Sequence, residues 1–432
     1  MTSLPAAAPG QKDFWRRLVE ECFRREAGSA VPIPGDGVDL LETGVLDSMG
    51  WVSFLRSVES VSGVSDLASG LNEASANLAA VLAALQASHP EAQPATQSAF
   101  LHATSSADPT MIAGSSAAVG SRLVLSKEVD RAFGMPIGKL RNRAGIESLA
   151  YASEVETELT LGTKAAEEAL HAASCGAQEL DWIIATSETH LDYPSLAAQL
   201  HSRLLARENC GALDVGGACL GLLNALAVAQ SLIGSGAAQT VTVITADIHS
   251  RTLTPGRVAG EFGGLFGDGA SAFVLRRAGG TGFASGYRFG DFLFGCAGQY
   301  AKAIQVAHKI VGGLDVQFDG EALSRAAITR LEKVITAVEL RSGIPRASVG
   351  AFATHQPNPR LLTLLARQCG VSPDVFPPIS RTYGNLGPST CGAALHAALQ
   401  KAFKLEPAER KPIFLASLGP GLLFGGSWLT PS

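Results

Sequence analysis

The feature that most constrains the fold is a glycine-rich turn between a β-prone segment and an apolar helical pattern. Gly216-Gly217 forms the turn, and the helical pattern runs from Leu220 to Ile233 before Gly234-Ser-Gly236. Glycine allows the backbone to reverse sharply there. Cys219 then falls at or near the first turn of the helix. The stretch predicts a strand, a tight turn and a helix, the repeating unit of an α/β protein.

Cys219 has two interpretations. A thiol at a helix N-terminus feels the positive end of the helix dipole, which favours the nucleophilic thiolate. Alternatively Cys219 is structural, because free cysteines are among the most buried residues. His355 and Asn385 lie in small-residue loops far downstream. Taken alone, His355 is equally consistent with a hydrogen-bonded core residue, and Asn385 with a turn residue. A Cys with a distant His and Asn is a known nucleophile arrangement, so their joint occurrence favours chemistry.

Composition excludes several classes of protein. Of 432 residues, 46% are hydrophobic and 17% charged, which predicts a well-cored protein of two to four domains. The net charge of −5 and the lack of a basic run exclude a nucleic-acid partner. We expect no membrane span and no signal peptide. The seven Cys form no CxxC pair, so we expect no metal site, no disulfide framework and a cytoplasmic location.

The chain divides into two unequal parts. Residues 11–88 carry apolar residues at helical spacing and predict a small helical domain. Residues 89–108, rich in Pro, Ala, Ser, Thr and Gln, predict a flexible linker. Residues 109–432 alternate between strand and helix patterns in two halves, about 109–278 and 279–432, and predict an α/β fold.

The predicted elements of the larger part follow from periodicity. The strands are one beginning at Met111, then Trp182–Ser187, Thr240–Ala246, Ala270–Leu275, Ser348–Thr354, and a strand or hairpin over Lys411–Trp428. Besides the helix after Cys219, the helices are Glu156–Ala173, Ala322–Leu340, Pro359–Gln368 and Gly387–Ala402.

Five stretches, in order, resemble the ketoacyl-(acyl carrier protein) synthase III branch of the thiolase superfamily. They begin at Leu213, Leu265, Thr354, Tyr383 and Ser417. The resemblance implies the thiolase fold, a duplicated α/β/α/β/α sandwich, and a homodimer. It also implies that Cys219 accepts an acyl group from a thioester of a carrier protein or coenzyme A.

The resemblance assigns roles to other residues. His355 and Asn385 would stabilise the enolate that forms when a malonyl-type thioester loses CO₂. Gly421 N–H, with Cys219 N–H, would form the oxyanion hole for the acyl carbonyl.

Two stretches depart from the family. Lys139 stands where coenzyme A-using members carry a Trp, so a carrier-bound acyl donor is favoured. Residues Phe289–Tyr300 match no stretch of the family, and either line a substrate pocket or form an ordinary loop.

The N-terminal part resembles an acyl or peptidyl carrier domain, centred on Asp47-Ser48-Met49. The resemblance implies four helices and a 4'-phosphopantetheine arm on Ser48, attached by a phosphopantetheinyl transferase. A Ser at a helix start is exposed, and its phosphate would meet free backbone N–H groups. The alternative is that Ser48 only caps the helix. Residues Ser48–Ser62 hold a single acidic residue, Glu59, which is closer to peptidyl or D-alanyl carriers.

Together these features predict a fused carrier–ketosynthase that performs decarboxylative Claisen condensation in polyketide or specialised fatty-acid biosynthesis. The first alternative is an acyltransferase that moves the acyl group from Cys219 to an alcohol, amine or carrier thiol, with His355 as general base. The second is a non-catalytic scaffold that docks carriers, against which the intact Cys219, His355 and Asn385 set argues.

Overall fold

The computed structural model divides into two compact units, Met1–Ala99 and Phe100–Ser432. It describes residues 11–28, 31–62, 67, 71, 76–88, 101–103, 110–278, 286–308, 314–318 and 320–432. None of the helices in these ranges is long and apolar enough to cross a membrane.

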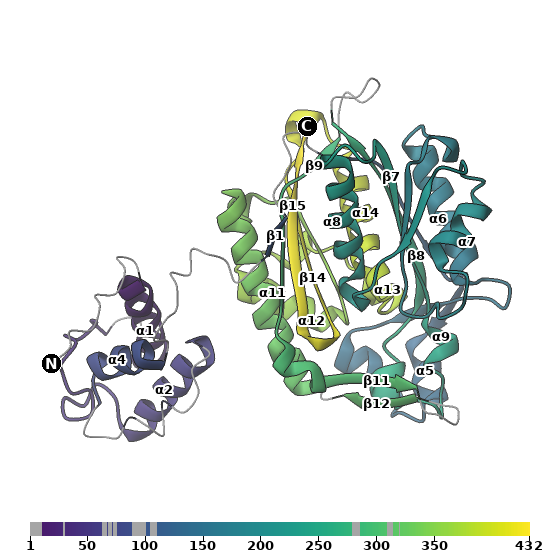
Figure 1. The fold of residues 1–432 in the computed structure, drawn as a ribbon. Helices are drawn as coiled ribbons and strands as arrows, with labels where there is room; N and C mark the ends of the chain where they lie inside the picture. The colour runs from purple at the N-terminus through teal and green to yellow at the C-terminus, as the bar shows by residue number, and fades with distance from the viewer. Residues whose placement is uncertain are drawn as a thin grey trace. The chain divides into compact units, whose positions relative to one another are not determined.

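The first unit is helical and has its own core. Its described helices are α1 (Gln11–Ala27), α2 (Ser48–Ser62) and α4 (Leu78–Ser88) (Figure 1). The buried rings of Phe23 and Phe54 meet edge to face, with centroids 6.2 Å apart. The helical character predicted for residues 11–88 is confirmed in these three helices. Most residues between α2 and α4, where a fourth helix would fall, lie outside the described residues.

The second unit is built on one sheet of 11 described strands, which has two halves. The first half has the order β6-β5-β7-β8-β2, formed by Gly211–Asp214, Trp182–Thr186, Thr240–Ile248, Asp268–Arg277 and Thr110–Val119. The second half has the order β13-β14-β15-β10-β1, formed by Ala351–Thr354, Ile413–Gly419, Leu423–Pro431, Phe292–Cys296 and Leu101–Ala103. Strand β9 (Tyr287–Phe289) pairs with both β15 and β2 and joins the halves.

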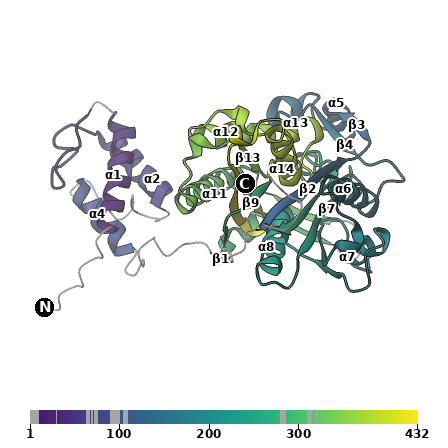
Figure 2. The same ribbon diagram turned by 90° about the horizontal axis from the view of Figure 1, so that it is seen from above.

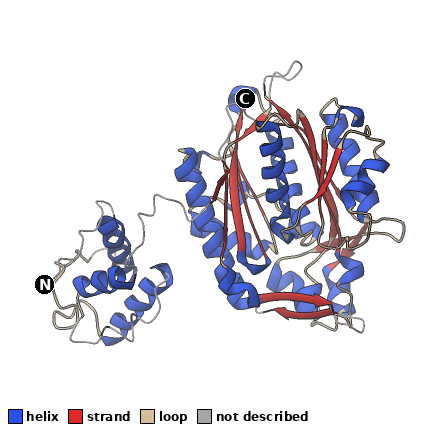
Figure 3. Ribbon diagram, in the orientation of Figure 1, coloured by secondary structure: helices blue, strands red, loops and turns tan. Residues whose placement is uncertain are grey.

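Helices form three layers around the two half-sheets (Figures 1 and 2). Between the half-sheets lie α8 (Gly221–Gly234) and α14 (Pro388–Ala402). One outer face carries α6 (Glu158–Ala172) and α7 (Leu196–Arg203), and the other carries α11 (Gly320–Ser342) and α12 (Pro359–Cys369). Figure 3 shows the alternation of helix and strand layers, which is the five-layer arrangement that the resemblance implied.

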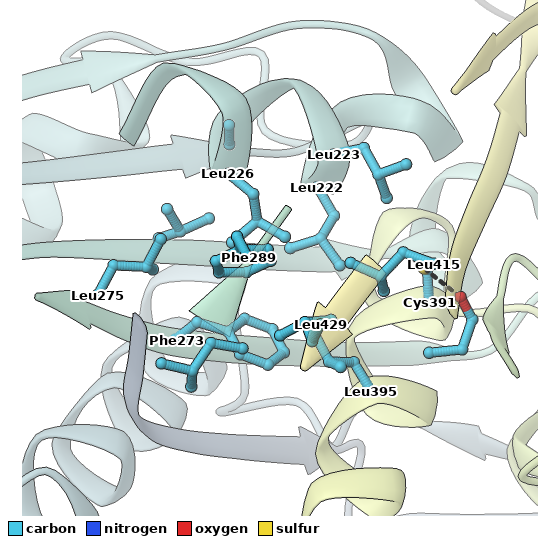
Figure 4. Packing of buried hydrophobic residues seen from close by; sticks show 14 of the residues in the cluster. Leu222, Leu223, Leu226, Phe273, Leu275, Phe289, Cys391, Leu395, Leu415 and Leu429 are labelled. Carbon is cyan, nitrogen blue, oxygen red and sulfur yellow. Dashed lines mark hydrogen bonds between the residues drawn. The ribbon is translucent and has the colours of Figure 1, made fainter. Parts of the chain in front are cut away.

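The central helices are buried because their sequences are nearly free of charge. Helix α8 has no charged residue, and a helix that is apolar on all sides belongs in a core. Leu222 and Leu226 of α8 and Leu395 of α14 are fully buried in one cluster (Figure 4). The thiol of Cys391 donates a hydrogen bond to the Ala353 carbonyl oxygen at 3.5 Å in the same region. Both half-sheets therefore share this core.

The shorter elements complete the second unit. They are β3 (Arg122–Leu125), α5 (Ser126–Ala132), a π-helical turn (Leu140–Ala144), β4 (Ser148–Tyr151), α9 (His249–Thr252), α10 (Gly260–Gly263), β11 (Ile304–His308), β12 (Leu314–Phe318) and α13 (Ile379–Tyr383). The long helices and strands predicted from periodicity are confirmed to within a few residues at their ends.

Two predictions were wrong in part. Residues 101–103, which the composition assigned to the linker, form β1 and pair with β10. Strand β10 would otherwise present unpaired backbone N–H and C=O groups at the edge of the sheet. Residues 101–103 pair with these groups through their backbone, which side-chain composition does not reveal. Residues Phe289–Tyr300 include the end of β9 and all of β10 rather than an ordinary loop, and none of them lines the cavity that holds Cys219. Phe289 and Phe292 are buried in the central core, and β10 pairs with β15, so backbone pairing and aromatic burial decide this segment.

Candidate active site

The structure brings three of the predicted site residues together. Cys219, His355 and Asn385 line one cavity of about 150 Å³ in the second unit. The rest of its wall is mostly apolar and includes Phe262, Leu265, Phe266, Ile304, Val306, Leu361 and Leu418. A mainly apolar wall with a few convergent polar groups is typical of a small-molecule site.

Cys219 lies in the tight turn that directly precedes α8, as predicted. Gly217 has φ of 135° and Ala218 has φ of 49°, a left-handed conformation that is strained for a residue with a Cβ. The Ser417 hydroxyl donates to the Cys219 carbonyl oxygen at 2.8 Å and ties the turn to β14. The turn therefore holds the thiol at a fixed point of the cavity.

The expectation that the helix dipole favours a thiolate at Cys219 is wrong in direction. Burial raises the pKa of the Cys219 thiol well above its usual value, and the carboxylate of Glu188 raises it further. Desolvation and a neighbouring negative charge both disfavour a thiolate, and here they outweigh the dipole.

His355 directly follows strand β13, and its backbone N–H donates to the Ala416 carbonyl oxygen at 3.1 Å. Burial lowers the pKa of its imidazole to about 4. The ring is therefore neutral at pH 7 and carries one N–H donor. Its Nδ1 has no hydrogen-bond partner among the described residues.

The Asn385 side chain is oriented by its own acceptor contacts. Its Oδ1 accepts hydrogen bonds from Gly387 N at 3.0 Å and from Thr390 Oγ1 at 3.1 Å. These contacts leave the Nδ2 donor for the cavity, which Asn385 lines.

The backbone around Asn385 explains why this residue is not itself the turn residue. Positive φ angles fall on Gly384 (76°) and Gly387 (60°) instead. Asn385 N donates to Leu265 O at 2.8 Å, and Gly267 N donates to Asn385 O at 2.9 Å. These two backbone hydrogen bonds hold the loop that carries Asn385 against residues 265–267.

A second pair of residues at the site was missed by sequence reasoning. Glu188 lines the cavity with Cys219, and its Oε2 lies 3.3 Å from Nε2 of the buried His249. The two follow β5 and β7, which are parallel neighbours with Thr186 opposite Thr245. In α/β proteins, polar residues that follow adjacent parallel strands often form a binding or catalytic site. Glu188 and His249 follow this pattern, which could have identified them from the sequence.

Glu188 and His249 form a charged pair. Burial alone would raise the pKa of Glu188, but His249 holds it below its usual value. Burial would likewise lower the pKa of His249, but Glu188 and Asp247 raise it to about 9. The His249 Nδ1 lies 3.1 Å from the Gly267 carbonyl oxygen and donates to it. Burial raises the pKa of Asp247 to about 7, and its Oδ1 accepts the Glu188 backbone N–H at 2.5 Å.

Two further predicted residues lie apart from the cavity wall. Gly421 has φ of 79° in the turn between β14 and β15, where Gly419 and Pro420 line the cavity and Gly421 does not. Its role in an oxyanion hole stays a prediction. Lys139 forms an ion pair with Glu261.

Ser48 begins α2 in the first unit, and its side chain is outside the described residues. The Asp47 carboxylate accepts the Gly50 N–H at 2.7 Å, so Asp47 caps this helix.

The chain is similar to known proteins over the second unit. Two family profiles match, 3-oxoacyl-(acyl-carrier-protein) synthase III over residues 213–298 and its C-terminal part over 340–430. The beta-ketoacyl-(acyl-carrier-protein) synthase III of Serratia proteamaculans is 29% identical over 296 residues, covering 66% of this chain and 88% of that protein. The Escherichia coli protein of the same name is 28% identical over 290 residues, covering 66% and 88%.

Solved structures agree with this. The crystal structure of 3-oxoacyl-(acyl-carrier-protein) synthase III from Aquifex aeolicus superposes with a TM-score of 0.65 at 27% identity, covering 74% of this chain and 99% of that one. OleA from Xanthomonas campestris has a TM-score of 0.66 at 21% identity, covering 74% and 98%, and supports the fold alone.

The five-layer architecture and the Cys219 cavity define the second unit as an α/β enzyme domain with the thiolase fold. Within that class it is similar to ketosynthase III of the thiolase superfamily.

Proposed function

We propose that the second unit catalyses decarboxylative Claisen condensation between an acyl and a malonyl-type thioester. The observation that carries the proposal is the single apolar cavity shared by Cys219, a neutral His355 and Asn385 with its Nδ2 donor left over. The related proteins are named for 3-oxoacyl synthesis on acyl carrier protein, which supports the same reaction class.

The proposed reaction has two stages. Cys219 first takes the acyl group from a donor thioester and releases the donor thiol. The malonyl-type thioester then loses CO₂, and the N–H groups of His355 and Asn385 stabilise the enolate oxygen. The enolate carbon attacks the Cys219 thioester, whose oxyanion would meet Gly421 N–H and Cys219 N–H. Collapse releases Cys219 and a β-ketoacyl thioester.

The carrier half of the proposal rests on the first unit. Ser48 would carry 4'-phosphopantetheine, installed by a phosphopantetheinyl transferase, and would present thioesters to Cys219 of its own chain or of a homodimer partner. Support comes from the position of Ser48 at the start of α2 and from Asp47 acting as the cap. Lys139 in place of a Trp favours a carrier-bound donor over coenzyme A. We infer a role in polyketide or specialised fatty-acid biosynthesis.

Intact-protein mass spectrometry tests both halves. The chain is treated with a phosphopantetheinyl transferase, then with malonyl and short acyl donors, beside Ser48→Ala and Cys219→Ala variants. We expect the arm only with Ser48, the acyl mass only with Cys219, and a condensed product only with both. An unmodified Ser48 would refute the carrier assignment, and an acylated Cys219 that never consumes malonyl thioester would refute condensation.

One observation favours a second candidate, acyl transfer from Cys219 to an alcohol, amine or thiol. Decarboxylation needs no base, whereas such an acceptor must lose a proton. The ionised Glu188 carboxylate lines the cavity with Cys219 and is an acceptor for that proton. An ester, amide or thioester product without CO₂ release would decide for this function.

A further inference from the structure

The cavity presents its nucleophile in an unreactive form. Cys219 is 8% exposed, and burial and Glu188 both hold its thiol protonated. Since the thiolate is the attacking species, acylation of Cys219 needs a group that accepts the thiol proton as sulfur attacks.

Only a few titratable groups face this thiol in the described structure, and their contacts distinguish them. His355 is neutral because burial lowers its pKa to about 4, and in the proposed reaction it serves as an N–H donor to the enolate oxygen. Asp247 does not line the cavity, and its Oδ1 accepts hydrogen bonds from Glu188 N and from the Ser187 hydroxyl at 3.2 Å. Glu188 lines the cavity with Cys219, and its buried Oε1 has no hydrogen-bond partner among the described residues. Among the described residues, Glu188 is thus the carboxylate that both lines the Cys219 cavity and has an oxygen without a hydrogen-bond partner.

We propose that Glu188 is the general base that takes the Cys219 thiol proton during acyl loading and returns it to the departing donor thiol, with His249 as its positioning residue. This inference rests on the proposed acylation of Cys219, a step that condensation and acyl transfer share.

The step balances in protons and bonds. The S–H bond of Cys219 breaks as its sulfur bonds to the acyl carbon, and Glu188 becomes a carboxylic acid. The tetrahedral intermediate then breaks its bond to the donor sulfur. The carboxylic acid gives its proton to that thiolate, so an acyl thioester and a thiol become a new thioester and a new thiol, and Glu188 is again ionised.

His249 orients the carboxylate rather than reacting. Its Nδ1 is fixed on the Gly267 carbonyl oxygen, which leaves Nε2 facing Glu188 Oε2. Gly387 packs against both groups, because a Cβ there would lie 3.2 Å from His249 Nε2 and 3.4 Å from the Glu188 carboxyl carbon. With Oε2 held in this way, Oε1 is the oxygen left for the thiol.

The test compares Glu188→Gln, which keeps the shape of the side chain, with Glu188→Asp and with the exposed control Glu208→Gln. Stopped-flow release of 4-nitrophenolate from 4-nitrophenyl butyrate reports first-turnover acylation of Cys219, with Cys219→Ala as the blank. We expect Glu188→Gln to slow it at least about 100-fold, Glu188→Asp less, and Glu208→Gln not at all.

A second readout separates base catalysis from simple charge repulsion. The pH profile of Cys219 alkylation by iodoacetamide should move to lower pH in Glu188→Gln, because the variant loses the negative charge beside the thiol. If Glu188 only repels the thiolate, the variant acylates as fast as the parent protein or faster, which would overturn the proposal.

The ester assay also distinguishes failure of the proposed condensation from failure of Glu188 as the general base. Slow acylation in Glu188→Gln together with a parent protein that forms no condensed product would refute the proposed function alone. Unchanged acylation in the variant together with normal condensation would refute the base alone. No acylation of Cys219 in the parent protein would refute both.

Discussion

Each polar residue of the cavity is fixed as a hydrogen-bond donor or acceptor by its surroundings in the fold. Both acceptor contacts of Asn385 are made by Oδ1, His355 is neutral because it is buried, and Glu188 is ionised because His249 is beside it. Each side chain is thereby set as a donor or an acceptor before substrate arrives, and such preorganisation is a main source of enzymatic rate enhancement.

The Asn385→Asp variant tests the Nδ2 donor of Asn385 separately from its Oδ1 acceptor. The carboxylate keeps an acceptor for Gly387 N and Thr390 Oγ1 but loses the Nδ2 donor and adds negative charge where an enolate would form. We expect CO₂ release from a malonyl thioester to fall by roughly 100-fold or more, while 4-nitrophenyl butyrate still acylates Cys219. Decarboxylation at the parent rate would show that Asn385 is not a donor in this step.

His249→Gln tests the charged pair through stability. The folded-state pKa of His249 is about 9, above the unfolded value near 6.5, so its protonation stabilises the fold. This stabilisation is complete below about pH 6.5 and is lost as pH rises through about 9.

Urea denaturation of the His249→Gln variant and the parent protein should differ by on the order of 3 kcal/mol at pH 6 and by little at pH 10. His171→Gln, an exposed histidine on α6, is the control and should change neither value. A difference that does not depend on pH would contradict the raised pKa.

The sequence identified Cys219, His355 and Asn385 because each sits in a motif whose residue types are unusual together. It did not identify Glu188 and His249, which lie in separate segments and meet only because β5 and β7 are parallel neighbours. The protonation state of Cys219 was predicted with the wrong sign, because burial and a partner 31 positions away decide it rather than the local helix.

At the scale of elements, close packing of the central helices on the sheet depends on residues without side chains. Gly392 of α14 faces β8, where an added Cβ would lie 1.9 Å from the Ser271 hydroxyl oxygen. That hydroxyl is fully buried and lies 2.8 Å from Thr245 Oγ1. The helix can approach this hydrogen-bonded pair only with glycine there.

Gly392→Ala should therefore destabilise the second unit by about 2 kcal/mol, because overpacking forces α14 or the Ser271 network to move. Chemical denaturation measures the change. Gly298→Ala is the matched control, because its Cβ would meet only Cys296 Sγ at 4.0 Å, and it should change stability by less than about 0.5 kcal/mol. Equal stability of the two variants would contradict the packing argument.

Periodicity predicted the long elements well because they are buried on one face or on all faces. It missed β1, the β11–β12 hairpin and the π-helical turn at Leu140–Ala144. These short segments are fixed by backbone pairing with distant strands or by local hydrogen bonds, and such partners leave no pattern in the segment itself.

At the scale of the whole molecule, the two units keep separate cores. The cluster around Phe23 and Phe54 contains only residues of the first unit, and the other described clusters contain only residues of the second. A unit that buries its own apolar surface can fold alone.

Residues 100–432 expressed alone should therefore unfold within about 3 °C of the second unit in the full chain, as measured by calorimetry. Cys219 should still be acylated by 4-nitrophenyl butyrate, while condensation that depends on Ser48 should require the first unit to be added back. Loss of cooperative unfolding in the shorter chain would show that the units depend on one another.

The shared central core also sets an order of events during synthesis. Helix α8 ends at Gly234, and its packing partner α14 begins only at Pro388. At ribosomal speeds of roughly 5–20 residues per second, α14 is synthesised on the order of 10 to 30 s after α8. For this interval the nascent first half exposes an apolar surface that only its own later half can cover. Chaperone supply and the pace of translation across residues 235–388 should thus govern the yield of folded protein.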